Sequence, residues 1–205
     1  MKKKAILRTT SDIPDTARQR LSSEISAIMP LETGPTPLFR SAVPDQPSFI
    51  QIIAYMVVWA PLTIVASNFL AQLAKRAAND AWDHKKEIAA KLNAVTVAPL
   101  KKFAEALNKA RHASEQNPYI VVGIPFPDDY FGTTFRFQAE DENDMAWFIA
   151  NFLVKVEAIE KAIQEEMAGE HRPLAPVQLH FQKDGSFIMK WIDRDELDEY
   201  ERRIE

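Results

Sequence analysis

The chain has 205 residues, of which 46% are hydrophobic and 26% charged, so it is long and apolar enough to bury one substantial core. The absence of Cys excludes a disulfide framework, a thiolate nucleophile and a Cys-ligated metal centre. The five Gly are too scattered to form the phosphate-binding loops GxxxxGKS/T or GxGxxG. We therefore expect a globular protein with no catalytic, cofactor or metal site that a local motif would reveal.

The net charge of −4 is unevenly distributed along the chain. Residues 1–48 carry seven Lys/Arg and five Asp/Glu, residues 49–116 carry nine and five, and residues 117–205 carry nine and nineteen. The last segment alone has a net charge of −10. Because an acidic surface attracts basic proteins and repels the nucleic-acid backbone, we expect a basic protein partner and no nucleic acid. A solvated face that only maintains solubility is the alternative interpretation.

The first 47 residues are expected to form a strand, a helix and a connector. A short apolar run predicts a strand over 3–9. Apolar residues at spacings of three and four then predict a helix over 13–28, for which Ser11 and Asp12 offer an N-cap. Five prolines between residues 30 and 47 exclude a helix there and predict a connector with room for one edge strand.

The middle of the chain, residues 48–116, is expected to be helical. The run from Ser48 to Gln51 has the form of a capping box, so it predicts a helix that begins at Phe49 and continues to about residue 92. Pro61 is expected to kink this helix. Pro99 is expected in the first turn of a further helix, because proline is favoured there.

No charged side chain occurs between residues 46 and 74. This stretch is long and apolar enough for a single-pass membrane anchor with residues 49–70 as the span. Lys75 and Arg76 follow it, so the positive-inside rule would place the C-terminal region in the cytoplasm, beneath the inner membrane. Five polar or helix-breaking residues interrupt the stretch and favour instead a helix buried in the core, or at a self-association interface, of a soluble cytoplasmic protein. The sequence leaves both interpretations open.

After residue 117 the pattern changes, and we expect a ββαββ unit. Alternating and β-branched runs predict two hairpins, separated by a helical stripe. The expected elements are strands over 119–124 and 133–138, a helix over 141–167, strands over 177–182 and 186–192, and a short helix in the acidic tail over 193–205. The predicted class is α+β, in which a four-stranded antiparallel sheet is covered by one helix and residues 49–116 add a helical layer. Three segments are thus expected: 1–47, 48–116 and 117–205.

Two acidic clusters in this last segment supply the candidate partner-binding residues. The candidates are Asp128, Asp129, Tyr130, Phe131, Glu140, Asp141 and Glu142. The first four lie in the loop of the first hairpin, where aromatic side chains beside charges are typical of a protein-binding hot spot, although aspartates also form turns. The last three lie at the predicted start of a helix, where carboxylates cap free N–H groups.

No enzyme motif accompanies these residues. The zinc-protease pattern HExxH is absent. Asp80, Asp83, His84 and Glu87 share one predicted helix face, but two neighbouring lysines favour a self-paired, solvated surface over a metal site. The sequence therefore predicts a non-enzymatic protein-binding module, such as a prokaryotic immunity or escort protein that binds a basic partner. A membrane-anchored interaction or effector protein is the second hypothesis, and an enzyme without a local motif is the third.

Overall fold

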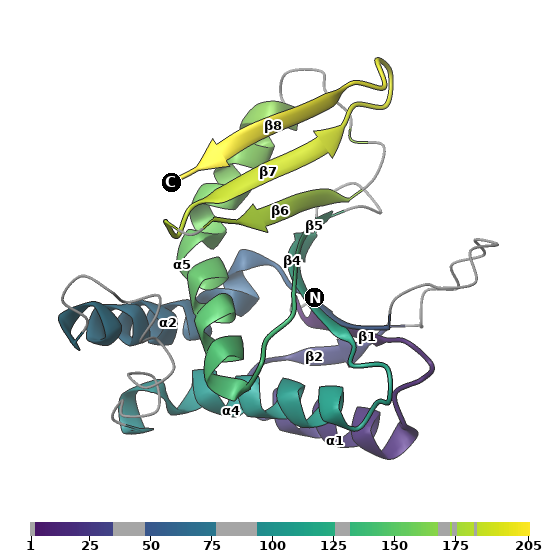
Figure 1. Ribbon diagram of the computed structural model, residues 1–205, viewed down its shortest axis with the longest axis vertical. Helices are drawn as coiled ribbons and strands as arrows, with labels where there is room; N and C mark the ends of the chain where they lie inside the picture. The colour runs from purple at the N-terminus through teal and green to yellow at the C-terminus, as the bar shows by residue number, and fades with distance from the viewer. Residues whose placement is uncertain are drawn as a thin grey trace.

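A computed structural model describes residues 3–34, 48–76, 94–125, 132–167, 173, 176–182 and 184–205. Within these residues the chain forms one mixed sheet of eight strands with four helices on one of its faces (Figure 1). The strand order is β2-β1-β3-β4-β5-β6-β7-β8. In chain order the elements are β1 (Ala5–Thr9), α1 (Asp15–Ser26), β2 (Leu31–Thr33), β3 (Phe49–Ile53), α2 (Met56–Arg76), α4 (Ala94–His112), β4 (Tyr119–Pro125), β5 (Gly132–Phe137), α5 (Glu142–Met167), β6 (Val177–Phe181), β7 (Phe187–Ile192) and β8 (Glu199–Ile204).

The N-terminal strand and helix are confirmed. β1 alternates buried and half-buried residues, and α1 buries Leu21 and Ile25 against the rest of the core. The connector is predicted to have room for one edge strand. This strand is β2, which pairs parallel to β1. The predicted N-cap is wrong, because Pro14 occupies that position and no side chain caps α1. Asp12 has another partner, described below.

The helix predicted to begin at Phe49 is wrong over residues 49–55. Phe49 to Ile53 is β3, which pairs antiparallel with β1 and parallel with β4. The carbonyl oxygen of Ser48 accepts a hydrogen bond from the backbone N–H of Tyr119, 2.9 Å away, so this residue continues the sheet and starts no helix. A short apolar run fits a buried strand and a buried helix equally well, and the neighbouring strands decide between them.

Two prolines lie inside the helices on either side of residues 77–93. α2 begins at Met56 and contains Pro61 in its interior. α4 begins at Ala94, so Pro99 lies inside it and not in its first turn. Each proline lacks one backbone N–H donor, a loss that packing of the helix against the core offsets. The predicted end of the first helix near residue 92 lies outside the described residues.

The C-terminal elements agree with prediction up to β7, but their pairing does not. The hairpins β4–β5 and β6–β7 are antiparallel as expected. β5 and β6 are parallel, because α5 returns the chain to the end of the sheet where β5 began. The sheet is therefore mixed and not purely antiparallel, which corrects the α+β prediction to a mixed α/β fold. The predicted tail helix is also wrong, since residues 199–204 form β8.

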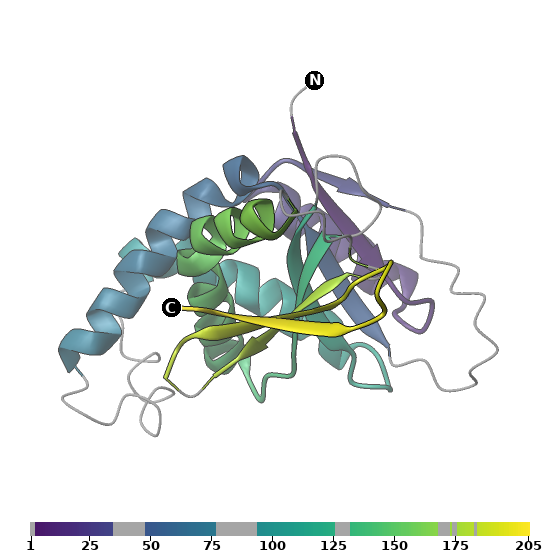
Figure 2. The same ribbon diagram turned by 90° about the horizontal axis from the view of Figure 1, so that it is seen from above.

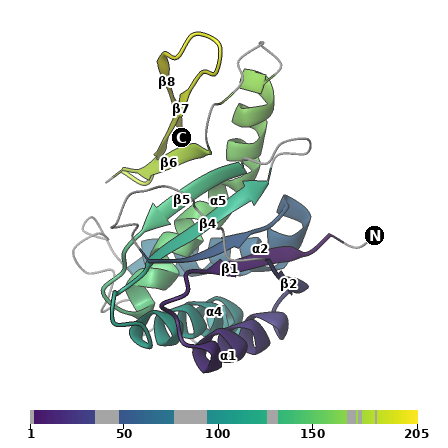
Figure 3. The ribbon, with the colours of Figure 1, turned by 90° about the vertical axis from the view of Figure 1, so that its right-hand side faces the viewer.

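The crossover through α5 has an uncommon hand. β3 and β4 are parallel to each other, as are β5 and β6, but the two pairs point in opposite directions in the sheet. In each pair the second strand lies on the same side of the first, and the connecting helices cover the same face of the sheet. Two such crossovers must have opposite hands. Figure 3, in which α5 passes behind the sheet, shows that α5 makes the left-handed one, whereas nearly all such connections are right-handed.

The core lies between the helical layer and the sheet and centres on aromatic side chains. Trp59 of α2 makes edge-on contacts with Phe103 of α4 and Phe152 of α5, with ring centroids 6.0 Å apart in each case. Its indole Nε1 donates a hydrogen bond to the carbonyl oxygen of Gly123 in β4, 3.1 Å away. This side chain therefore joins three helices to the middle of the sheet.

α2 buries only one of its faces. Its inward face consists of Val58, Trp59, Leu62, Ala66, Phe69 and Leu73. Figure 2 shows α2 at the outer side of the helical layer, and its outward residues are exposed. Among the described residues, one helix segment, Met56–Ala74, has the length and hydropathy of a membrane span, with 33% of it buried in the fold. The uncharged stretch is thus divided between β3, a core face and an exposed face.

Candidate binding site

Only part of the predicted partner-binding set falls within the described residues. Asp128, Asp129, Tyr130 and Phe131 lie outside them. Glu140, Asp141 and Glu142 are described and lie together where the chain leaves β5 and enters α5. The candidate site therefore consists of this corner, where β5 leads into α5, and of the elements packed against it.

Asp141 and Asp144 hold the start of α5 in place. The Asp141 Oδ1 atom accepts hydrogen bonds from the backbone N–H groups of Asn143 at 2.9 Å and Asp144 at 2.8 Å. In return, the Asp144 Oδ2 atom accepts a hydrogen bond from the backbone N–H of Glu140 at 3.1 Å. These bonds satisfy N–H groups that a helix start leaves without partners. Asp141 is therefore a capping residue, while Glu140 and Glu142 remain exposed.

A buried arginine that sequence reasoning missed connects this corner to α4. Arg111 is only 3% exposed. Its guanidinium donates to the carbonyl oxygens of Ala139 and Glu140 and, at 2.9 Å, to the Asn108 side chain. Burial lowers the pKa of Arg111, and the negative charges of Asp144 and Asp141 oppose that shift. Because a basic residue in the last turn of a helix is ordinary, the sequence contains no signal for this role.

A second polar cluster lies beside the first and joins β1, β3 and the end of α4. The Asp12 Oδ2 atom accepts hydrogen bonds from Ser48 Oγ at 2.6 Å and Ser114 Oγ at 2.5 Å. The hydroxyls of Thr10 and Ser48 are 2.9 Å apart. Burial raises the pKa of Asp12, but the hydrogen bonds from Ser114, Ser48 and Thr10 outweigh it and hold that pKa below its ordinary value.

Residues from both clusters line one cavity of about 510 Å³. The lining residues are Arg111, His112, Ser114, Asn117, Gln138, Ala139 and Glu140. Asn117 has a φ of 46°, a left-handed conformation that asparagine tolerates and that turns the chain from α4 into β4. The cavity is thus polar, and exposed Glu140 lies at its edge.

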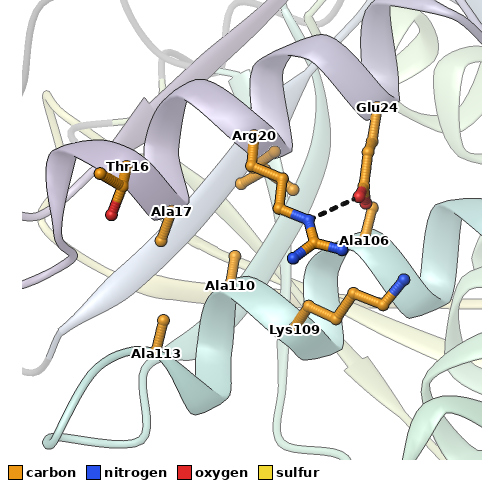
Figure 4. A pocket seen from close by; sticks show the side chains of 9 residues that line it. Thr16, Ala17, Arg20, Glu24, Ala106, Lys109, Ala110 and Ala113 are labelled. Atoms are coloured by element: carbon orange, nitrogen blue, oxygen red, sulfur yellow. Dashed lines mark hydrogen bonds and ion pairs between the residues drawn. The ribbon is translucent and has the colours of Figure 1, made fainter.

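Two further cavities offer less chemistry. The groove between α1 and α4 has a volume of about 270 Å³, and small alanines from both helices form its floor (Figure 4). Arg20 and Glu24 above it form an ion pair with each other at 2.9 Å. A third cavity of about 700 Å³ lies between α1 and the β1–β2 edge, where Asp15 and Arg18 are likewise paired. Because the charged side chains at these two cavities are paired with each other, they offer little attraction to a charged ligand.

In the described parts of the chain, no group of three or more His, Asp or Glu residues could hold a metal ion. The face formed by Asp80, Asp83, His84 and Glu87 lies outside those parts. No family model, curated protein or solved structure matches the chain.

Proposed function

We propose that the protein is a non-enzymatic binding module that holds a basic segment of a partner protein at the start of α5, as an immunity or escort protein would. One observation carries this proposal: the exposed residue Glu140 lines a polar cavity of about 510 Å³, and Glu142, two residues farther along the chain, is also exposed. The volume falls within the range of sites that accept small groups. A Lys or Arg side chain inserted there would place its cation near the Glu140 carboxylate.

The cavity wall contains the cationic Arg111, whose charge is offset by neighbouring carboxylates. Asp141 and Asp144 offset the positive charge of Arg111, which is already bound to three oxygen acceptors. Glu140 adds a carboxylate to the wall of the cavity, and Glu142 adds a second exposed carboxylate close by in the sequence. A cationic partner would gain attraction to these carboxylates and to the acidic segment that contains them.

The test measures the affinity of a fluorescent Arg- and Lys-rich peptide by anisotropy at two salt concentrations. Glu140→Lys combined with Glu142→Lys should weaken binding at least about tenfold. The matched control, Glu157→Lys with Glu160→Lys, makes the same change in net charge farther along α5 and should have a much smaller effect. Equal losses in both variants would show a general effect of net charge and contradict the proposed site.

A single-pass membrane anchor over residues 49–70 remains the second candidate, favoured by the length and hydropathy of Met56–Ala74. It would require β3 to leave the middle of the sheet and Trp59 and Phe69 to leave the core, so we place it second. Resistance of the membrane-bound chain to alkaline carbonate would support the anchor. No observation on the described residues favours the third candidate, an enzyme.

A further inference from the structure

The first half of α2 presents an apolar surface to solvent. This surface, the α2 patch, consists of Met56, Val57, Ala60, Pro61 and Ile64, all exposed on the side opposite the core face. The exposed fractions are 63% for Val57 and 68% for Ile64. A contiguous apolar surface of this kind typically marks a contact with another protein or with a membrane.

The groups beside the α2 patch indicate which of these it contacts. Tyr55 directly precedes the helix, and the Lys3 Nζ atom lies 4.2 Å from the centroid of its ring. Lys3 is exposed, whereas the neighbouring Lys4 forms an ion pair with Glu32 at 3.9 Å. An apolar helix face bordered by an amphipathic aromatic side chain and by a lysine has the composition of a membrane-surface helix.

We infer that the α2 patch docks on the surface of a membrane containing anionic lipids, with α2 lying in the interface and the fold intact. Val57 and Ile64 would enter the boundary between headgroups and acyl chains, while Lys3 would face the anionic headgroups. Trp59 and Phe69 stay in the protein core. This mode differs from a span, because only the outward face of α2 meets lipid.

Charge complementarity favours lipid over a second copy of the chain. The α2 patch contains no carboxylate, so in a symmetric pairing of two such patches neither patch would bring a carboxylate of its own to Lys3. Anionic headgroups supply that partner along the whole surface. The inference is independent of the basic-partner site, which lies on α5 and uses different residues.

The test is flotation of the full chain with vesicles of phosphatidylcholine alone, or with about 30% phosphatidylglycerol. We expect binding to the anionic vesicles that falls as salt is raised. Val57→Glu with Ile64→Glu should lower the partition coefficient at least about tenfold, and Lys3→Glu should reduce the preference for anionic lipid. Leu197→Glu, at a residue 67% exposed in the β7–β8 turn, is the control and should bind like the wild type.

A second measurement reports the contact directly. The chain has no Cys, so Val57→Cys can carry a single environment-sensitive fluorophore. Its emission should rise and shift to shorter wavelength on anionic vesicles, whereas a label at Leu197→Cys should not respond. Absence of vesicle binding, or equal binding by Val57→Glu with Ile64→Glu, overturns the inference. A dimer in sedimentation velocity that this double variant converts to monomer also overturns it, as does carbonate-resistant insertion.

Discussion

The cluster around Asp12 tests how the sheet is joined to the end of α4. Asp12→Ala removes the acceptor of two hydrogen bonds, at 2.6 Å from Ser48 and 2.5 Å from Ser114. Hydrogen bonds to a charged group contribute about 1.5–3 kcal/mol each, and the two serine side chains regain part of this from other acceptors. We therefore expect the free energy of unfolding to fall by about 3 kcal/mol. Urea unfolding followed by circular dichroism measures it.

The same cluster predicts a pH dependence. The pKa of Asp12 in the folded protein lies below its ordinary value of 3.8, so the unfolded chain binds this proton more readily. The stabilisation by Asp12 is therefore complete well above 3.8 and is lost as the pH falls through the lower, folded pKa. Asp12→Asn cannot titrate, so its stability should fall less than that of the wild type over this acidic range.

Asp15→Asn provides the control, because Asp15 is exposed at the start of α1 and forms an ion pair with the neighbouring Arg18. Surface pairs contribute little, so this variant should lose less than about 0.5 kcal/mol. The reasoning about Asp12 is refuted if Asp12→Ala costs as little as the control. It is refuted as well if Asp12→Asn and the wild type lose stability in parallel on acidification.

Three further substitutions test other parts of the fold. Gly123→Ala should prevent folding, seen as loss of the cooperative thermal transition, because its Cβ would lie 1.9 Å from the carbonyl oxygen of Thr133. Leu197→Gly should raise the free energy of unfolding by about 0.5 kcal/mol, since an exposed leucine with a φ of 61° is strained, and an unchanged urea midpoint would contradict this. Arg111→Met should cost about 3 kcal/mol by leaving Asp144, 5% exposed, without its buried cation, and thermal melting with a near-wild-type Tm would argue against that role.

Elements whose pattern is local could be predicted from the sequence, and those that depend on distant partners could not. The β4–β5 and β6–β7 hairpins and α5 have clear periodicity and turn residues, and all three are confirmed. β8 reads Glu-Tyr-Glu-Arg-Arg-Ile, which has no apolar alternation. It becomes a strand because Lys190 of β7 pairs with Glu199 and Glu201, and Tyr200 stacks on Trp191. The parallel pairing of β5 with β6 depends on where α5 packs, which no local pattern records.

Of the candidate site, too, only the local contacts could be predicted from the sequence. Capping by Asp141 follows from an acidic residue placed before a helical stripe, so the sequence indicated it. The contacts of Arg111 join residues 28 and 29 positions apart, and those of Asp12 reach Ser114, 102 positions away. Such contacts depend on the folded topology. The cavity between them therefore had no signature in the sequence.

The strand order has a consequence for the chain as it is synthesised. From β3 onward every new strand is placed beside the strand made just before it, so the sheet grows in one direction as residues leave the ribosome. At each stage one open edge accepts the next strand. β7, with the sequence Phe-Ile-Met-Lys-Trp-Ile, would be an adhesive edge if growth stopped there. β8 covers it with a strand that carries two Glu and two Arg, so a translation product released before residue 199 should aggregate where the longer chain does not.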